Sequence, residues 1–351
     1  MKLFNTNAEL TPIAKAIMSE DIAALDDAVK NGFKINQPLI MTERIRELPI
    51  ELVLLEQKQK VLDWLLRKKV KLNDKNSPAM VSAAFHCDAA TLKTLVAHGA
   101  NVNTKDRVGK TAMSTALYSN RHDMIPVLIE LGYDMAHDGK SLRQAVFKRQ
   151  RKAIQIFLDL GVDVNFHQPD MVFPNNPSAV SVAASNQNDL QTVQLLIAHG
   201  ADVTIADTDG DRPYHHALAQ KNDALIELIK QLEPPQWHSV EWRLEQLAAY
   251  NMPPQLIEFL CGDDRTIQTP DSDCKWLALQ HITLIKEMKW QRRQFLELMD
   301  EVDNYDFGLA WYPKKKCLAY VDYEHDEFTL MGSWEAFIAD PSGELNKVFF
   351  G

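Results

Sequence analysis

Cysteine is scarce in this chain of 351 residues, and the cysteines that occur lie far apart. There are four of them, at Cys87, Cys261, Cys274 and Cys317, and no two form a CxxC pair. This spacing argues against a zinc knuckle and against a disulfide scaffold. We therefore expect the protein to work in a reducing compartment.

Long apolar runs are also absent. The N-terminal stretch MKLFNTNAELTPIAKAIMSEDIAALDD has no apolar run suited to a signal peptide. No segment approaches the roughly 20 apolar residues that a helix needs to cross a bilayer. The sequence predicts a cytoplasmic protein without membrane contact, and we expect a monomer when no partner is bound.

Motifs for catalysis and cofactor binding are missing as well. The chain has no GxSxG, Walker, HExxH or Rossmann glycine pattern. An acidic cluster made of Asp322, Glu324, Asp326 and Glu327 could attract a divalent ion, although hairpin tips are commonly charged for solubility. We expect no enzyme, no metal and no cofactor, with an enzyme site in residues 233–351 as an alternative.

Charge and tryptophan are unevenly distributed. Residues 1–232 hold 27 Lys and Arg against 27 Asp and Glu, whereas residues 233–351 hold 11 against 21 and carry the whole net charge of −10. Six of the seven tryptophans lie in that last third. Two compositions predict two domains, 1–232 and 233–351. The negative field of the second disfavours nucleic acid and favours a basic protein partner.

The first two-thirds of the chain repeat one phrase, an apolar helical stretch that ends in glycine. It occurs as LKTLVAHGANVN, IPVLIELGYDM, IQIFLDLGVDVN and VQLLIAHGADV. The glycines are Gly99, Gly132, Gly161 and Gly200, separated by 33, 29 and 39 residues. A period near 33 is typical of a helical repeat array, and each glycine falls where a helix end needs a left-handed residue.

A second phrase precedes the first at a nearly constant interval, as in GKTAMSTAL and GDRPYHHAL. It carries a small residue at one position in each unit, at Ala83, Ala116, Ala145, Ala183 and Ala217. Small side chains let the helix of one unit lie close to its neighbour. Both phrases favour a stacked array of helix pairs.

Together these phrases resemble the ankyrin repeat, a turn followed by a TPLHxA helix, a second helix and a GADVN ending. The resemblance covers about residues 5–232, in about seven units by that period. Unit two is the most divergent, because Lys69 and Val70 stand where the glycine is expected. The fold class is then mostly α, an ankyrin-repeat solenoid followed by a smaller α+β domain.

The resemblance implies protein binding on the turn tips and the exposed ends of the first helices. Aromatic and Arg side chains are the usual anchors of an interface, so Tyr118, Phe147 and Arg107 are the best candidates. The full set of predicted partner-binding residues in the array is Phe85, His86, Asp106, Arg107, Tyr118, Phe147, Lys148, Asp209, Asp211 and His216. Phe85 and Phe147 can equally pack between units.

One unit has a longer turn than the others. The stretch FHQPDMVFPNNPSAV, which follows Asn165, holds three prolines at 169, 174 and 177. Long ordered loops are often binding elements, and a tolerated insertion is the simpler alternative.

The last third changes character. Residues 240–260 predict helix, turn and helix, and residues 279–302 predict an amphipathic helix from the spacing of their apolar side chains. Residues 308–333 are rich in aromatic and β-branched side chains and predict a β-meander. A short helix over 333–340 follows, with Ser333 as its N-cap.

This region resembles the SMI1/KNR4 (SUKH) family. The similarity rests on the acidic helix start leading into a Pro turn at 241–260, the Tyr- and Asp-rich strands at 309–331, and the terminal WEAFIAD. In bacteria that family is known for immunity proteins, which neutralise a toxin. The resemblance implies that Asp322, Glu324, Asp326 and Glu327 belong to a partner surface.

The stretch DTDGDRPYHHA, from Asp207, could suggest a calcium loop. Such a loop needs glycine after its third acidic ligand and a Glu near its end. Here Gly210 precedes Asp211, and Leu218 stands where the Glu should be. The ankyrin resemblance accounts for the stretch better, as a turn tip followed by a helix that starts at Pro213. It places Asp207, Asp209, Asp211 and His216 on a contact surface.

Three functions remain open at this point. The first is an immunity protein that binds and neutralises a bacterial toxin, for example a basic nuclease. The second is an ankyrin scaffold or an exported adaptor that binds host proteins. The third is an enzyme with its site in residues 233–351. We favour the first.

Overall fold

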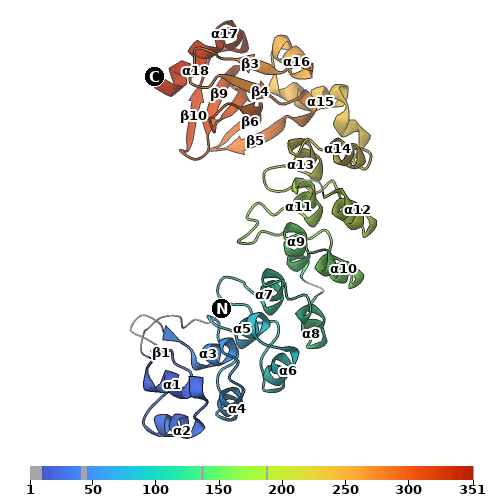
Figure 1. Cartoon of the computed structure of the whole chain (residues 1–351). Helices are drawn as coiled ribbons and strands as arrows, with labels where there is room; N and C mark the ends of the chain where they lie inside the picture. Colours follow the sequence, from blue (N-terminus) through green and yellow to red (C-terminus); the bar gives the residue numbers. More distant parts are fainter. Residues whose placement is uncertain (1–9, 41–45, 136–137, 187–188, 351) are drawn as a thin grey trace. The chain divides into compact units, whose positions relative to one another are not determined.

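The computed structural model describes residues 10–40, 46–135, 138–186 and 189–350. Four parts of the predicted array lie outside these ranges, namely residues 5–9, 41–45, 136–137 and 187–188. The chain divides into two compact units, Met1–Asp209 and Gly210–Gly351, and each is described by itself. The helix-pair array and the sheet-containing unit are drawn in Figure 1.

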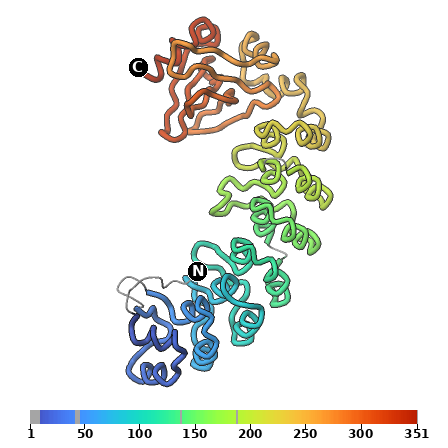
Figure 2. Tube along the Cα trace, in the orientation of Figure 1, coloured from blue at the N-terminus to red at the C-terminus, as the bar shows by residue number. Residues whose placement is uncertain are grey.

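Unit 1 is an array of antiparallel helix pairs, and the chain passes from one pair to the next through a turn (Figure 2). Its helices are α1 (Pro12–Ser19), α2 (Ile22–Lys30), α3 (Pro49–Leu55), α4 (Gln59–Arg67), α5 (Ala79–His86), α6 (Ala89–Ala97), α7 (Ala112–Tyr118), α8 (Met124–Glu130), α9 (Gly139–Phe147), α10 (Arg151–Asp159), α11 (Ala179–Ser185) and α12 (Leu190–Ala198). Two short strands, β1 (Leu39–Ile40) and β2 (Arg46–Glu47), pair antiparallel before α3.

The helix ends have the left-handed geometry that the repeated glycines predict. Gly99, Gly132 and Gly200 have φ values of 94°, 89° and 87°. In the divergent second unit Lys69 takes this place with φ of 59°. An L-residue tolerates that conformation only at a cost, so this unit bears a strain that the glycines avoid.

Small residues let neighbouring first helices pack closely, as predicted. Ala83, Ala116, Ala145 and Ala183 are each 0% exposed. The helices that carry them contact one another in the order α5, α7, α9 and α11, and α5 also contacts α3. The core of unit 1 is therefore a continuous seam along the array.

An asparagine ladder joins the turns between successive units. The side-chain amide of Asn103 donates to the carbonyl of Gly132 at 3.0 Å, and its oxygen accepts from the backbone N–H of Asp134 at 2.8 Å. Asn73 and Asn165 bond in the same way to the next glycine and to the residue two places beyond it. Each asparagine thus fixes the spacing of two units.

Unit 2 joins the last helix pair to two antiparallel sheets. Its helical elements are α13 (Pro213–Ala219), α14 (Asp223–Lys230), η1 (Pro235–His238), α15 (Val240–Leu247), η2 (Ala248–Tyr250), α16 (Pro254–Cys261), η3 (Ile282–Leu284), α17 (Trp334–Ala339) and α18 (Pro341–Phe350). One sheet has the order β10 (Glu327–Leu330), β9 (Cys317–Asp322), β8 (Gly308–Tyr312), β6 (Arg293–Glu297) and β5 (Lys286–Trp290). The other has the order β3 (Thr266–Gln268), β4 (Trp276–Leu279) and β7 (Met299–Val302).

Several predictions for this region are confirmed. Helix, turn and helix occur at α15 and α16, and the β-meander is β8, β9 and β10. The Ser333 hydroxyl accepts from the backbone N–H of Ala336 at 3.3 Å and caps α17. The fold class is therefore an α-helical repeat array followed by an α+β region.

The predicted helix over residues 279–302 is wrong, because this stretch forms β5, β6 and β7. The apolar residues of this stretch fit two patterns at once, the spacing of one helix face and the alternation of a β-strand. Met288 of β5 pairs in register with Phe295 of β6 across a two-residue turn. The turn residues Gln291 and Arg292 have φ values of 47° and 64° where Asn-Gly is the usual signal. The sequence therefore lacked the turn signature that identifies a hairpin.

The core of unit 2 draws on residues far apart in the sequence. Trp311 is 2% exposed, and its indole N–H donates to the carbonyl of Tyr250 at 2.8 Å. Leu256, Leu296 and Phe337, from α16, β6 and α17, are each 0% exposed and belong to the same cluster. In the described part of the chain no helix is long and apolar enough to cross a membrane.

Candidate protein-binding site

Three consecutive units of the array expose an aromatic side chain at the same repeat position. Phe85, Tyr118 and Phe147 lie at or next to the last residue of α5, α7 and α9 and are 42%, 66% and 50% exposed. We call these three residues the aromatic stripe. A packed core would bury such large aromatic side chains. Their exposure at matching repeat positions is typical of the anchor residues of a protein interface.

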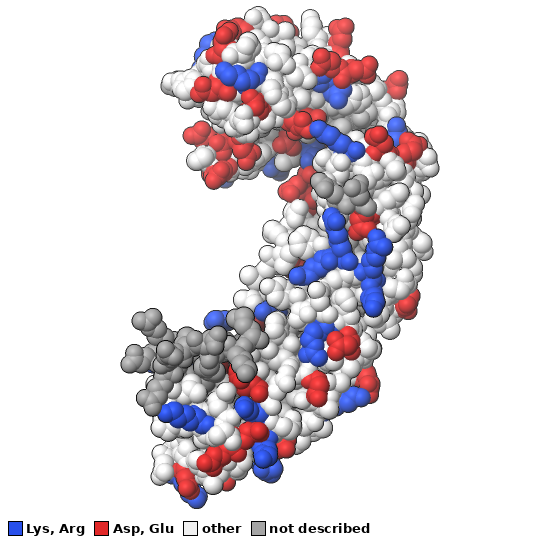
Figure 3. Space-filling view, in the orientation of Figure 1, with Lys and Arg blue, Asp and Glu red and all other residues white. Residues whose placement is uncertain are grey.

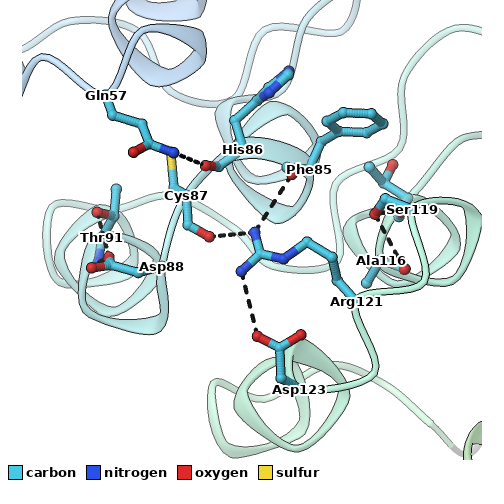
Figure 4. Close-up of polar contacts among 11 residues, drawn as sticks. Gln57, Phe85, His86, Cys87, Asp88, Thr91, Ala116, Ser119, Arg121 and Asp123 are labelled. Atoms are coloured by element: carbon cyan, nitrogen blue, oxygen red, sulfur yellow. Dashed lines mark hydrogen bonds and ion pairs between the residues drawn. The ribbon is translucent and has the colours of Figure 1, made fainter. Parts of the chain in front are cut away.

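Side chains from the neighbouring turns hold the ends of these helices. Arg121 donates to the carbonyl of Cys87 at 2.5 Å and also to that of Phe85 at 3.5 Å, while Gln57 donates to the carbonyl of His86 (Figure 4). Gln150 repeats this arrangement one unit further along, with a bond of 2.7 Å to the carbonyl of Leu117. The stripe is therefore carried on ends whose carbonyls already have partners.

Phe85 and His86 border a hollow with a volume of about 460 Å³. The hollow lies between the α3–α4 pair and the α5–α6 pair, and Gln57, Leu62 and Arg121 contribute to its wall. Burial is the main cause that lowers the pKa of His86 below its usual value, so its imidazole favours the neutral form. Burial also raises the pKa of Cys87 to about 12, which makes its thiol a poor nucleophile.

Tyr118 and Phe147 each have a specific neighbour. The Nζ of Lys148 lies 4.5 Å from the centre of the Tyr118 ring, a cation–π contact between α7 and the residue after α9. Phe147 makes an edge-to-face contact with Phe173 of the long turn, with ring centres 5.4 Å apart. Phe147 thus has a packing role on one side and remains half exposed on the other.

The long turn after Asn165 is anchored by a buried arginine. Arg143 in α9 is 0% exposed, and it donates to the carboxylate of Asp170 at 2.7 Å and to the carbonyl of Pro177 at 2.9 Å. Its guanidinium also lies 4.9 Å from the Phe173 ring. Arg143 is not among the residues predicted from the sequence, although a charged residue on the apolar face of a helical stretch is a signal that could have identified it.

The predicted turn-tip residues have different environments. Asp106 accepts from the backbone N–H groups of Val108 and Lys110 at 2.9 and 2.8 Å, so its carboxylate builds its own turn. Arg107 is exposed beside it. The turn therefore presents Arg107 to solvent while Asp106 holds the turn in shape.

In DTDGDRPYHHA the acidic residues also separate into distinct roles. Asp207 is 8% exposed and accepts from Asn175 at 3.2 Å, so its predicted place on a contact surface is wrong. Asp209 is exposed. Asp211 forms an ion pair with Lys286 of β5 at 2.7 Å. His216 lies partly buried in α13.

The acidic cluster lies on the turn between β9 and β10. Asp322 accepts from the backbone N–H groups of Glu324 and His325 at 3.0 and 2.9 Å and from the His325 ring at 2.9 Å. These hydrogen bonds, foremost the one from the backbone of His325, lower the pKa of Asp322. Glu324, Asp326 and Glu327 are exposed. Within the ranges that the structure describes, no three His, Cys, Asp or Glu side chains converge as metal ligands would.

Helix pairs stacked in one direction, with left-handed glycines and an asparagine ladder, define a helical repeat solenoid. The family model described as "Ankyrin repeats (3 copies)" matches residues 52–138 and 142–235, which is more than half of the chain. The chain belongs to the ankyrin repeat family. Ankyrin repeats bind proteins and are typically not catalytic.

Curated relatives share the repeats over part of their length. Ankyrin repeat and SOCS box protein 6 from Homo sapiens is 33% identical over 127 residues, which cover 33% of this chain and 30% of the relative. An ankyrin repeat protein of Acanthamoeba polyphaga mimivirus is 26% identical over 237 residues, which cover 65% of this chain and 30% of the relative. The chain thus spans about a third of the length of these relatives.

The solved structures that match include one with 17% identity and a TM-score of 0.43, over 52% of this chain and 97% of the matched chain. It is described as the predatory endopeptidase Bd0816 from Bdellovibrio bacteriovorus in complex with the immunity protein Bd3460.

Proposed function

We propose that this ankyrin repeat protein is a non-catalytic immunity protein, which binds a bacterial toxin and neutralises it. The observation that carries the binding role is the aromatic stripe, because three units expose a large aromatic side chain at one position. Such side chains bury much area on binding and lose little rotamer freedom, and they dominate measured interfaces.

We assign each unit a different role in binding the toxin. Residues 1–209 hold 24 Lys and Arg against 24 Asp and Glu, whereas residues 210–351 hold 14 against 24. The negative unit 2 is suited to attract a basic toxin and to speed the encounter, and the stripe is suited to hold a partner once bound. The likeness of residues 233–351 to the SMI1/KNR4 family, and the cytoplasmic location, are part of the same proposal.

The test is co-expression of the full chain with the product of the neighbouring gene, followed by purification through a tag on one of them. We expect a stable complex and protection from that product's toxicity. Phe85→Ala with Tyr118→Ala should weaken the complex by about 100-fold or more, since two anchors of about 1.4 kcal/mol or more each are removed. Ser185→Ala serves as the control, because Ser185 holds the matching position in the unit that follows Phe147 and is not aromatic. A neighbouring product that is harmless and does not bind refutes the immunity role.

A further inference from the structure

A basic turn follows the last aromatic residue of the stripe. Four of the five residues in KRQRK, namely Lys148, Arg149, Arg151 and Lys152, are cationic and exposed. Among the residues that the structure describes, none of the four forms an ion pair with a carboxylate, and Lys148 contacts the ring of Tyr118 instead. We call these four residues the basic turn.

The fifth residue of the run fixes the place of this turn. Gln150 is 6% exposed, and its amide donates to the carbonyl of Leu117 and to the side-chain oxygen of Asn120, beyond the end of α7. Arg149 takes the left-handed conformation with φ of 54°. The basic turn is therefore held against the helix end that carries Tyr118 rather than on a separate surface.

The positive charge extends beyond the turn itself. Residues 105–152 hold 10 Lys and Arg against 5 Asp and Glu, although unit 1 as a whole is neutral. Lys and Arg side chains gather over the region of α9 and α10 on the face drawn in Figure 3. An unpaired cluster of like charge raises the local potential and favours ligands of the opposite sign.

Apolar side chains border the stripe on the side of the long turn. Met171 and Val172 are 76% and 59% exposed, and they precede Phe173, which contacts Phe147. Asp170, just before them, is held by Arg143. Met171 and Val172 therefore form an exposed apolar surface on an anchored turn, next to the aromatic stripe and the basic turn.

We propose that the aromatic stripe and the basic turn bind an acidic segment of a partner protein, one whose carboxylates alternate with apolar side chains. The carboxylates pair with the basic turn, and the apolar side chains pack on the stripe and on Met171 and Val172. This inference rests on the proposed function of the stripe and adds the chemistry of the segment that it binds. A basic toxin would then offer an acidic segment here while its basic surface faces unit 2.

A nucleic acid fits this surface less well than a carboxylate-rich peptide. Each strand carries a phosphate about every 3.4 Å, so tight binding uses cations along a track of several phosphates. The cations here are concentrated in one turn of a chain with a net charge of −10. The experiment below includes an oligonucleotide as a separate arm.

The test is selection of a random dodecapeptide library displayed on phage against the full chain, with counter-selection against Tyr118→Ala/Phe147→Ala. Neighbouring helices are about 8–10 Å apart, so the stripe spans about 20 Å, and twelve extended residues reach about 40 Å. Synthetic copies of the selected peptides are then titrated against the wild type and two charge variants. The first is K148Q/R149Q/R151Q/K152Q. The matched control is K314Q/K315Q/K316Q, which neutralises an exposed lysine run in unit 2.

We expect the peptides that depend on the stripe to hold an excess of Asp and Glu. Their affinity for the first variant should be at least about tenfold lower than for the wild type, and their affinity for the control should equal that for the wild type. The affinity should also fall as salt is raised. Stripe-dependent peptides that are neutral or basic would overturn this inference and leave the stripe's role intact. If no selected peptide depends on the stripe, this inference fails, and the immunity role is still decided by the complex with the neighbouring gene's product. A 20-nucleotide single strand that binds as tightly as the peptides would also overturn it.

Discussion

The two units differ in how far along the chain their contacts reach. In unit 1 the ladder bond from Asn103 reaches Gly132, and Arg143 reaches Pro177, each about one repeat away. In unit 2 Trp311 bonds to Tyr250, and Asn346 bonds to Asp271, 75 residues apart in sequence. An array of nearest-neighbour interfaces can open one repeat at a time, whereas a core built from distant segments opens as a whole.

This difference explains where a binding surface can be placed. Because each first helix in unit 1 is supported by its neighbours, the residues at its end are free to face a partner. The stripe exposes three aromatic side chains without disturbing the alanine seam behind them. In unit 2 the large aromatic residues Trp311 and Phe337 are 2% and 0% exposed and hold the fold together.

Removal of Trp311 should have the largest effect. Trp311→Ala leaves a large cavity and an unpaired carbonyl at Tyr250, so we expect unit 2 to lose about 3–5 kcal/mol of unfolding free energy. Hydrogen exchange should accelerate across all of β5–β10 together, while unit 1 exchanges as in the wild type. Trp311→Phe, which keeps most of the volume, should lose less. Acceleration limited to β8 would contradict a single cooperative core.

Loss of Arg143 is the corresponding test in unit 1. Arg143→Ala leaves the carboxylate of Asp170 without its partner, and breaking a buried ion pair typically costs about 3–5 kcal/mol. We expect exchange to accelerate in α9, α11 and the long turn, and not in α1–α4. The double variant Arg143→Met/Asp170→Asn removes both charges and should recover part of the loss. Uniform acceleration through the whole of unit 1 would show that the array unfolds as one body.

The asparagine ladder should contribute a smaller and more local effect. Asn103→Ala removes two hydrogen bonds between adjacent turns and should cost about 1–2 kcal/mol. The control is Asn76→Ala, which removes an exposed amide outside the ladder and keeps the bond from the Asn76 backbone N–H to Asp74. Chemical denaturation monitored by exchange in α5–α8 measures the difference. If both variants lose the same free energy of unfolding, the ladder does not determine the spacing of the units.

The smallest expected effect concerns the carboxyl pair Glu47 and Glu51. A hydrogen bond with Glu51, together with burial, raises the pKa of Glu47 from 4.5 to about 8. The folded state therefore holds its proton more tightly than the unfolded state, and this stabilisation is present below pH 4.5 and is lost as pH rises through 8. Glu47→Gln should flatten the dependence of Tm on pH between 5 and 9 and raise Tm at pH 8, whereas Glu56→Gln should not. A wild-type Tm that is unchanged from pH 5 to 9 would contradict the shared proton.

Much of the array could be predicted from the sequence, because each repeat carries its own local signals. Gly99, Gly132 and Gly200 mark helix ends, and Ala83 and its counterparts mark the packed seam. The stripe was predicted as a set of positions, and the structure adds that these side chains are exposed. The division of the chain at residue 232 and the partner surface stay predictions.

The remaining features depend on contacts that no local pattern encodes. The hairpin of β5 and β6 turns at Gln291 and Arg292, which hold positive φ without the usual Asn or Gly. Asp211 was predicted to lie on a contact surface at a turn tip, and only the fold brings the Nζ of Lys286 to 2.7 Å from its carboxylate. The basic turn was not predicted, although four of five consecutive residues there are cationic. The net charge of residues 1–232 is zero because acidic residues elsewhere balance these cations.

The most direct test of the central claim is the affinity of the neighbouring gene's product for two matched variants of the full chain, measured by surface plasmon resonance, which also gives the rate constants. Tyr118→Ala/Phe147→Ala removes two aromatic side chains of the stripe, and Glu324→Gln/Asp326→Asn/Glu327→Gln neutralises exposed acids of unit 2. We expect the stripe variant to lose about 100-fold or more in affinity through faster dissociation, and the acidic variant to lose less, chiefly through slower association. An unchanged affinity for the stripe variant, with binding lost in the acidic variant, would contradict the assignment of the stripe as the binding surface.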